Sequence, residues 1–492
     1  MRRIAFKTAL LTCACLTASL GAAPASADTL REALARAYYD NPSLEAARAT
    51  LRATDENVPI QRAAGLPTLN NSTTYTENVK QSTSSFISPD RSLSSNLDLT
   101  IPVYRGGSVR NGILAAENRI EAGRADLRGT ESGIFSQVVA TYMDVILNEA
   151  LVGLTSNNVE VLSVNLEATS DRFQIGDLTR TDVAQSESRL ALARSDLRTA
   201  QANLVNARER YIELVGQEPG VLQPPPPLPG LPADVGLAVD TALEANPDLI
   251  AARERAEASD FDIRVAGAGR LPRVDVFTGG GYQNYLGSLG TVPGSASAQQ
   301  VSTTAQGGVR LTLPLFQGGA PAARQRQAQA NAQATLEQVV AAERGVISQV
   351  RAAYSSWRAA NAIIASTQSA VDAATLSLEG VRAENSVGNR TVLDILDAQQ
   401  ELLRAQVQLV TARRNEYVAG FTLLAAMGRA EARDLGLGDG SVTGEGPLYD
   451  PVVNAERVEG IIWDWQQDPD PVTQSPRTVD IPAQDADIPP SS

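Results

Sequence analysis

Short segments in two parts of the chain alternate apolar and polar residues with the period of a β-strand. In the segment 95–104 the aliphatic positions are Leu97, Leu99, Ile101 and Val103. In the segment 306–316 they are Val309, Leu311, Leu313 and Leu315. Polar residues lie between them, so each segment predicts a strand with one aliphatic and one polar face. Together with strand-like segments at 68–80 and 273–285, they make two predicted strand pairs, 68–104 and 273–316.

A long helix is predicted after each strand pair, over 108–173 and 320–385. At about 1.5 Å per residue, each would be about 100 Å long, far more than a globular domain needs. Return helices are predicted over 180–215 and 391–428, after glycine turns. Apolar residues recur at every seventh position, as in the series Val183, Leu190, Leu197, Leu204 and Tyr211. This spacing favours coiled-coil packing, although an ordinary bundle core would use the same residues.

The strand-to-helix motif occurs twice, at 99–107 and again at 311–319. Each copy ends with a proline, an aromatic residue and two glycines, namely Pro102, Tyr104, Gly106 and Gly107, and then Pro314, Phe316, Gly318 and Gly319. Because strands, turns and helices repeat in the same order, the chain is predicted to be a duplicated unit. The predicted repeats span 28–221 and 233–435, and the proline-rich segment 222–232 links them.

The first residues resemble a secretory signal peptide. A basic start with Arg2, Arg3 and Lys7 precedes a mostly apolar stretch, and Ala25-Ser26-Ala27 forms a cleavage site, so residues 1–27 are predicted to be removed. Both cysteines of the sequence lie within this segment, which excludes disulfide and thiol chemistry from the mature chain. At the other end, the acidic segment 436–492 is rich in proline and glycine and is predicted to be largely disordered or draped on the helical body.

The remaining composition excludes several classes of function. The net charge of −14 argues against nucleic acid as a partner. The chain has no histidine, which removes serine and cysteine triads, the common zinc sites and the most frequent general base. We therefore expect no enzyme activity, no metal and no cofactor. No membrane-spanning helix is expected either.

The strands offer another way to meet a membrane. A soluble sheet would show the same alternation, since one buried and one wet face have the same period. However, Tyr104 and Phe316 lie at equivalent strand-to-helix junctions, where aromatic residues line a membrane interface. Four strands cannot close a barrel, for which about eight are the usual minimum. If the strands contact lipid, the chain must therefore oligomerise, because unpaired edges are not tolerated there.

The duplicated plan, the Pro-x-x-x-Gly-Gly motif of each half and residues 387–398 resemble the TolC family of outer-membrane efflux channels. The resemblance covers residues 28–435 and implies a homotrimer in the outer membrane, with most of its mass in the periplasm. Its 12-stranded transmembrane barrel would continue as a long α-helical coiled-coil tunnel. It also implies a periplasmic adaptor and an inner-membrane ABC, RND or MFS transporter as partners, and the export of drugs or unfolded proteins.

The resemblance further implies a gate at the periplasmic entrance. The family's two acidic rings match Asp394 and Asp397, which lie on one side of a helix because they are three residues apart. Threefold symmetry would gather these carboxylates around one axis, where they would attract cations. Alternatively, Asp394 could cap a helix that follows Thr391.

Polar links between the helix pairs hold the family's entrance closed. Arg390 matches the arginine of those links and Asp182 an acidic partner, whereas Asn385 stands where a tyrosine is expected. The link could form, or both residues could face water.

Two other classes of function share part of this sequence pattern. A periplasmic coiled-coil scaffold or adaptor would remain in the soluble fraction, and gives no reason for aliphatic strands with aromatic ends. A carboxylate-dependent hydrolase would need a concave site around Asp394 and Asp397. The channel interpretation predicts a heat-modifiable trimer in the outer membrane.

Overall fold

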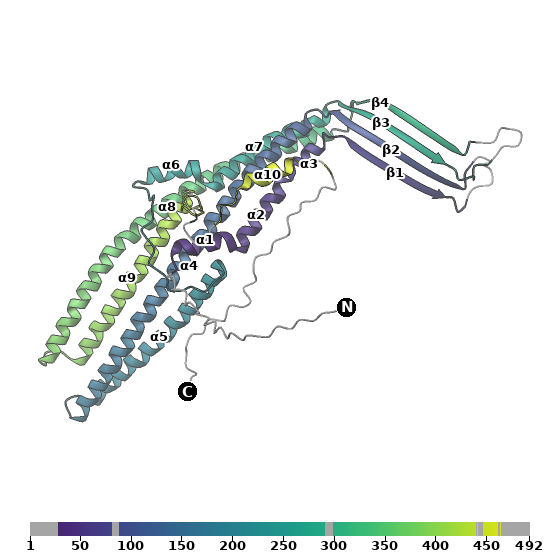
Figure 1. Cartoon of the computed structure of the whole chain (residues 1–492). Helices are drawn as coiled ribbons and strands as arrows, with labels where there is room; N and C mark the ends of the chain where they lie inside the picture. The colour runs from purple at the N-terminus through teal and green to yellow at the C-terminus, as the bar shows by residue number, and fades with distance from the viewer. Residues whose placement is uncertain are drawn as a thin grey trace, which may run out of the picture.

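The computed structural model describes residues 28–80, 88–290, 299–438, 440, 446–460 and 463. The signal peptide predicted for 1–27 lies outside the described residues, as does most of the predicted tail. The chain is an elongated body of long helices, with a four-stranded sheet projecting from one end (Figure 1). At the opposite end, two helical hairpins project in the same direction (Figure 1).

The elements occur in the same order in both halves, apart from an extra short helix in the first. The first half contains α1 (Leu30–Asp40), α2 (Pro42–Asp55), α3 (Asn57–Ala63), β1 (Thr68–Glu77), β2 (Arg91–Tyr104), α4 (Ser108–Gln174) and α5 (Arg180–Val215). The second contains α6 (Val235–Ala245), α7 (Pro247–Gly267), the 3₁₀ turn η1 (Ala268–Arg270), β3 (Arg273–Asn284), β4 (Val301–Thr312), α8 (Ala320–Ser386) and α9 (Val392–Ala426). A last short helix, α10, spans Pro451–Glu459.

One asparagine in each half fixes the position of the opening helices. The Asn41 side chain accepts hydrogen bonds from the first backbone N–H groups of α2, and Asn246 does the same for α7. A proline follows each asparagine at the first helical position, where its missing N–H leaves nothing unpaired. The amide of Asn41 also donates to Leu214 O at 3.0 Å, and that of Asn246 to Ala426 O at 2.9 Å. Each asparagine thus fastens the opening helices to the end of the return helix in its own half.

The four strands form one antiparallel sheet in the order β1-β2-β3-β4, with β1 and β4 at its edges. β4 starts and ends earlier than predicted, so Pro314 and Phe316 follow the strand instead of lying in it. A register shift between Pro102 and Tyr104 pairs Tyr104 with Val274. Val274 belongs to the aliphatic face by alternation with Val276, so the bulge brings the Tyr104 ring to that face.

The main hydrophobic core lies midway along the body, where the long helices meet α1 and α2. Its largest fully buried side chains include Phe135, Tyr142, Tyr211 and Phe421. The Tyr142 hydroxyl lies within hydrogen-bond distance of two carbonyl oxygens, 2.9 Å from that of Asp28 and 2.7 Å from that of Gln223. By length and composition, α4 could cross a membrane, contrary to the sequence expectation. α4 packs along α5, α7 and α9 and so belongs to this helical body.

Residues 446–460 are not disordered but lie on the helical body, which is the other of the two predictions for the tail. They run along α2 and include α10, whose Asn454 donates a 2.6 Å hydrogen bond to the buried carboxylate of Asp55. Arg62 on α3 pairs with Glu459 at 3.1 Å. Tyr449 N donates to the Tyr38 hydroxyl at 2.9 Å. These contacts join residues 446–460 to α1, α2 and α3, which are far away in the sequence.

Candidate functional site

The tip of the α8–α9 hairpin is built around a helix cap. Gly388 has a φ of +85°, which permits the sharp turn after α8. Thr391 is the N-cap of α9, and the Asp394 carboxylate accepts hydrogen bonds from the Thr391 N–H and hydroxyl, both at 2.8 Å. These hydrogen bonds lower the pKa of Asp394. Asp394 therefore caps α9 as a charged carboxylate, in agreement with the helix-cap alternative.

The tip of the α4–α5 hairpin repeats this arrangement. Gly176 has a φ of +83°, and Thr179 caps α5. The Asp182 carboxylate accepts hydrogen bonds from the Thr179 N–H at 2.9 Å and the hydroxyl at 2.7 Å, which lower its pKa. The duplicated sequence thus gives both hairpins the same capping box.

Arg390 interacts with its own hairpin. Its Nε lies 2.7 Å from a Glu384 carboxylate oxygen, and its NH1 lies 3.9 Å from Asp394 Oδ1. The Asn385 side chain donates to the Arg390 carbonyl at 2.7 Å. The predicted Arg390–Asp182 link is not formed within this chain, because Glu384 and Thr179 lie closer to these two side chains. Between neighbouring protomers the link stays a prediction.

Asp397 lies one turn further along α9 and contacts the other hairpin. Its Oδ1 is 2.8 Å from NH2 of Arg189 on α5. Arg189 is not among the site residues predicted from the sequence. Its position was a signal, because it precedes Leu190, a member of the seven-residue series. Charged residues beside such core positions are often placed to pair with a neighbouring helix.

A seam of apolar and amide side chains continues from this ion pair. Leu396 packs with Leu162, Leu190 and Ala193, which come from α4 and α5. Just beyond them, the nearly buried Gln399 lies 3.4 Å from the side-chain atoms of Asn158 and of Asn165. Buried amides specify one register of two helices, because a shift would leave them unpaired. The two hairpins therefore contact each other through a seam of defined register.

The strand-to-helix junctions depend on their glycine pairs. Gly106, Gly107, Gly318 and Gly319 all have positive φ values, from +58° to +80°. At Gly106 a Cβ would also lie 2.8 Å from the Leu271 Cβ, which explains why no side chain fits there. Tyr104 is 46% exposed and Phe316 90% exposed, so both aromatic rings are available to an outside phase. This position fits the membrane-interface role predicted for them.

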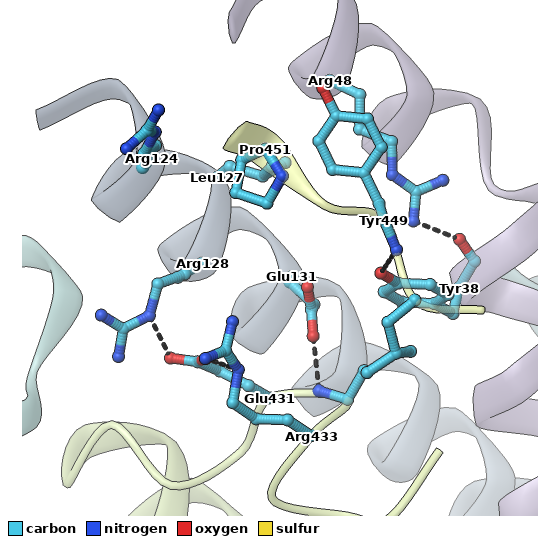
Figure 2. Close-up of a pocket in the computed structure, with 12 residues that line it drawn as sticks. Tyr38, Arg48, Arg124, Leu127, Arg128, Glu131, Glu431, Arg433, Tyr449 and Pro451 are labelled. Carbon is cyan, nitrogen blue, oxygen red and sulfur yellow. Dashed lines mark hydrogen bonds and ion pairs between the residues drawn. The ribbon is translucent and has the colours of Figure 1, made fainter. Parts of the chain in front are cut away.

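A partly buried charged cluster lies where α4 meets the chain after α9 (Figure 2). Arg128 Nε is 2.6 Å from Glu431 Oε1, and the Glu131 carboxylate accepts a hydrogen bond from Ala432 N. Burial raises the pKa of Glu131 to about 7, although the Ala432 hydrogen bond lowers it. The cavity beside them has a volume of about 60 Å³. Because drug-sized ligands occupy about 300–1,000 Å³, this cluster serves to fasten the chain and does not bind cargo.

Among the residues that the structure describes, no group of three or more Asp, Glu, His or Cys side chains is arranged to hold a metal ion. At the tips, Asp182 and Asp394 serve in helix caps, and Glu384 and Asp397 are paired with arginines.

Comparisons with known proteins identify the family. Residues 30–217 and 238–429 match the family model "Outer membrane efflux protein". The outer membrane efflux protein BepC of Brucella suis biovar 1 is 32% identical over 414 residues, which cover 84% of this chain and 88% of BepC. TolC of Escherichia coli K12 is 27% identical, covering 83% of this chain and 84% of TolC.

Solved structures show the same fold. The outer membrane protein VceC of Vibrio cholerae superposes with a TM-score of 0.68 at 24% identity, covering 81% of this chain and 96% of VceC. The fold class implied by the resemblance, a long helical body with membrane-spanning strands, is confirmed. Because members of this family are channels, the expectation that the chain is not an enzyme is confirmed too. The chain belongs to the outer membrane efflux protein family of TolC-like channels, and its place is the outer membrane.

Proposed function

We propose that three copies of this chain form the exit duct of an export system that spans the cell envelope. The observation that carries this proposal is the open sheet β1-β2-β3-β4, whose two edges pair with no other strand in the described part of the chain. In lipid, unpaired backbone groups cost several kcal/mol each, so the edges must find partners. β1 leaves the helical body and β4 returns to it, so β4 of one copy fits antiparallel beside β1 of the next.

Three sheets of four strands give a barrel of twelve. Strands of 10 to 14 residues are long enough for the apolar band of an outer membrane, which needs about 9–11 residues per tilted strand. The aliphatic face would contact lipid and the polar face would line the lumen. Tyr104 and Phe316 would then lie at the periplasmic edge of that band.

The periplasmic entrance would be narrowed by Asp394 and Asp397 of the three copies. Asp394 is held at the start of α9 by Thr391, so its carboxylate is fixed in place and charged. Asp397 is paired with Arg189, which lies on the neighbouring hairpin. The fixed Asp394 carboxylates favour cations at a constriction, and those of Asp397 add to this when their pairs with Arg189 break. The Arg189 pair joins the two hairpins, and breaking it would free α9 to move away from α5.

A periplasmic adaptor and an inner-membrane ABC, RND or MFS transporter would complete the export path. The long hairpins α4–α5 and α8–α9 point away from the sheet and would meet those partners in the periplasm (Figure 1). The name of BepC assigns efflux to that relative, and we propose the same general role here. The cargo would be small solutes or unfolded secreted proteins, as selected by the inner-membrane partner.

Ion selectivity in a planar bilayer tests this proposal. Asp394→Asn combined with Asp397→Asn should weaken the preference for cations and relieve block by multivalent cations added on the periplasmic side. Asp260→Asn is a matched control, because Asp260 forms a surface pair with Arg264 on α7, away from the tips. Unchanged selectivity in the double variant would remove the gate assignment. A purified protein that stays monomeric and does not conduct would overturn the duct.

A further inference from the structure

An arginine and an aromatic ring are stacked on the polar face of the sheet. The guanidinium carbon of Arg310 on β4 lies 4.9 Å from the centre of the Phe277 ring on β3. Gly308 is paired with Phe277, and a Cβ at Gly308 would be only 3.1 Å from the ring's Cζ. The glycine thus leaves the space in which the ring lies against β4. Cation–π contact then holds the guanidinium over the ring.

Alternation along β4 places Arg310 on the lumen side of the proposed barrel. Its neighbours Val309 and Leu311 are 68% and 66% exposed and point to the other face. That face is aliphatic and suits lipid. An arginine on the lipid side is destabilising, by an amount that grows toward the middle of the bilayer. The Arg310–Phe277 stack therefore faces the channel.

The stack lies at the periplasmic end of the sheet, because Arg310 is only two residues before the end of β4. Asp275 is opposite Arg310 in the register and could cancel its charge. However, NH2 of Arg105, at the β2–α4 junction, lies 3.3 Å from Asp275 Oδ1. Arg105 thus offsets the charge of Asp275, and Arg273 adds another cation at the start of β3. The balance of these four charged residues is positive.

We propose that Arg310, positioned by Phe277, forms with its two symmetry copies an anion-attracting ring where the barrel meets the helical tunnel. This inference rests on the proposed trimeric channel and deepens it. The aspartates at the periplasmic entrance favour cations, whereas this ring selects in the opposite sense at the other end of the tunnel. Small anionic solutes would be concentrated at the ring, as they are by arginine rings in anion pores.

Planar-bilayer recordings of the purified trimer test the ring, with a potassium chloride gradient and with citrate as a polyvalent anion. The recordings use the unsubstituted protein and also the Asp394→Asn/Asp397→Asn variant, in which the entrance carboxylates no longer dominate ion preference. In both backgrounds, Arg310→Gln should shift the reversal potential toward cation preference. Citrate added on the barrel side should reduce the current, and Arg310→Gln should abolish this reduction.

Two further variants separate charge from folding. Arg310→Lys keeps the positive charge and should keep most of the anion preference and the citrate effect. Gln306→Ala changes an uncharged residue on the same face of β4 and should change neither. If conducting Arg310→Gln trimers keep the original reversal potential and citrate response in both backgrounds, the proposal of an anion-attracting ring is wrong. The proposal of a trimeric channel is then unaffected. If the unsubstituted trimer does not conduct, both proposals are wrong.

Discussion

The Asp397 carboxylate on α9 lies 2.8 Å from the Arg189 guanidinium on α5 and so joins the two helical hairpins of the chain. The two residues are 208 positions apart and belong to different repeats. Asp394, only three residues earlier, contacts its own helix cap instead. Two aspartates that look equivalent in the sequence therefore have different partners. Asp397 is the one whose contact must change if the hairpins separate.

Breaking the Arg189–Asp397 pair should favour an open entrance. An exposed ion pair contributes about 0.2–1 kcal/mol, so one copy has a small effect, but three copies act together in a trimer. We expect Arg189→Gln to raise the mean single-channel conductance and the fraction of time spent open. Arg194→Gln, an exposed arginine on the same helix, should leave both unchanged. Equal conductance in the two variants would show that the Arg189 pair does not restrain the hairpins.

Stability should depend on pH through Glu131. Its pKa is about 7 in the folded protein, above its ordinary value of 4.5. Between these values the folded state holds a proton that the unfolded state has released, so the stabilisation is complete below pH 4.5 and is lost as the pH rises to about 7. Glu131→Gln keeps an acceptor for Ala432 N and should flatten this decline. The measurement is the melting temperature of the protein in detergent from pH 4.5 to pH 8.

The control for this experiment is Glu160→Gln, an exposed glutamate on the same helix. It should leave the decline as it is in the unsubstituted protein. If Glu131→Gln also leaves the decline intact, another group must titrate, and Glu131 would not carry the pH dependence.

The C-terminal strap, residues 446–460, should depend on Asn454. Asp55 is fully buried, and the Asn454 amide donates to its carboxylate. Asn454→Leu would leave that carboxylate without this donor, at a cost of about 1–3 kcal/mol. We expect faster proteolytic cleavage within the strap, with the helical body intact. Glu456→Gln, which changes an exposed residue of the same helix, should be cleaved at the original rate. Protection that is unchanged in Asn454→Leu would contradict this account of the strap.

The first strand-to-helix junction should not accept a side chain. Gly106 has a φ of +66° and lies close to Leu271. Gly106→Ala combines a strained backbone, at about 1–3 kcal/mol, with a steric clash, so it should lower the temperature at which the assembly dissociates. Gly133→Ala has open space within α4 and should be neutral or stabilising by up to about 1 kcal/mol. Equal dissociation temperatures would show that the junction tolerates a side chain.

Much of the fold could be predicted from periodicity and duplication. The alternation from Leu97 to Val103 lies within β2, and the seven-residue series includes the buried Leu190 and Tyr211. These signals are local, so they are visible in one chain. The capping role of Asp394 was also visible, because Thr391 precedes it by three residues.

The remaining features depend on contacts that no local pattern specifies. Arg189 meets Asp397 only because the two hairpins pack in one register. The strap 446–460 is held by single contacts, such as Asn454 with Asp55, in a segment whose composition suggests disorder. β4 ends at Thr312 because β3, its partner, begins at Arg273, so its end is set by another strand. The Tyr104 bulge likewise appears only when β2 and β3 are paired.

Cysteine cross-linking between β1 and β4 tests the central claim most directly. Both cysteines of the sequence lie in the predicted signal peptide, so introduced pairs would be the only ones in the mature chain. Ser72→Cys on β1 is combined in turn with Ser302→Cys, Thr304→Cys or Gln306→Cys on the polar face of β4. Thr303→Cys, on the opposite face, is the control and should not cross-link. The account predicts that at least one polar-face pair gives a covalent trimer on a non-reducing gel. If every cysteine pair gives only monomers and dimers on the gel, closure of the barrel by three copies is contradicted.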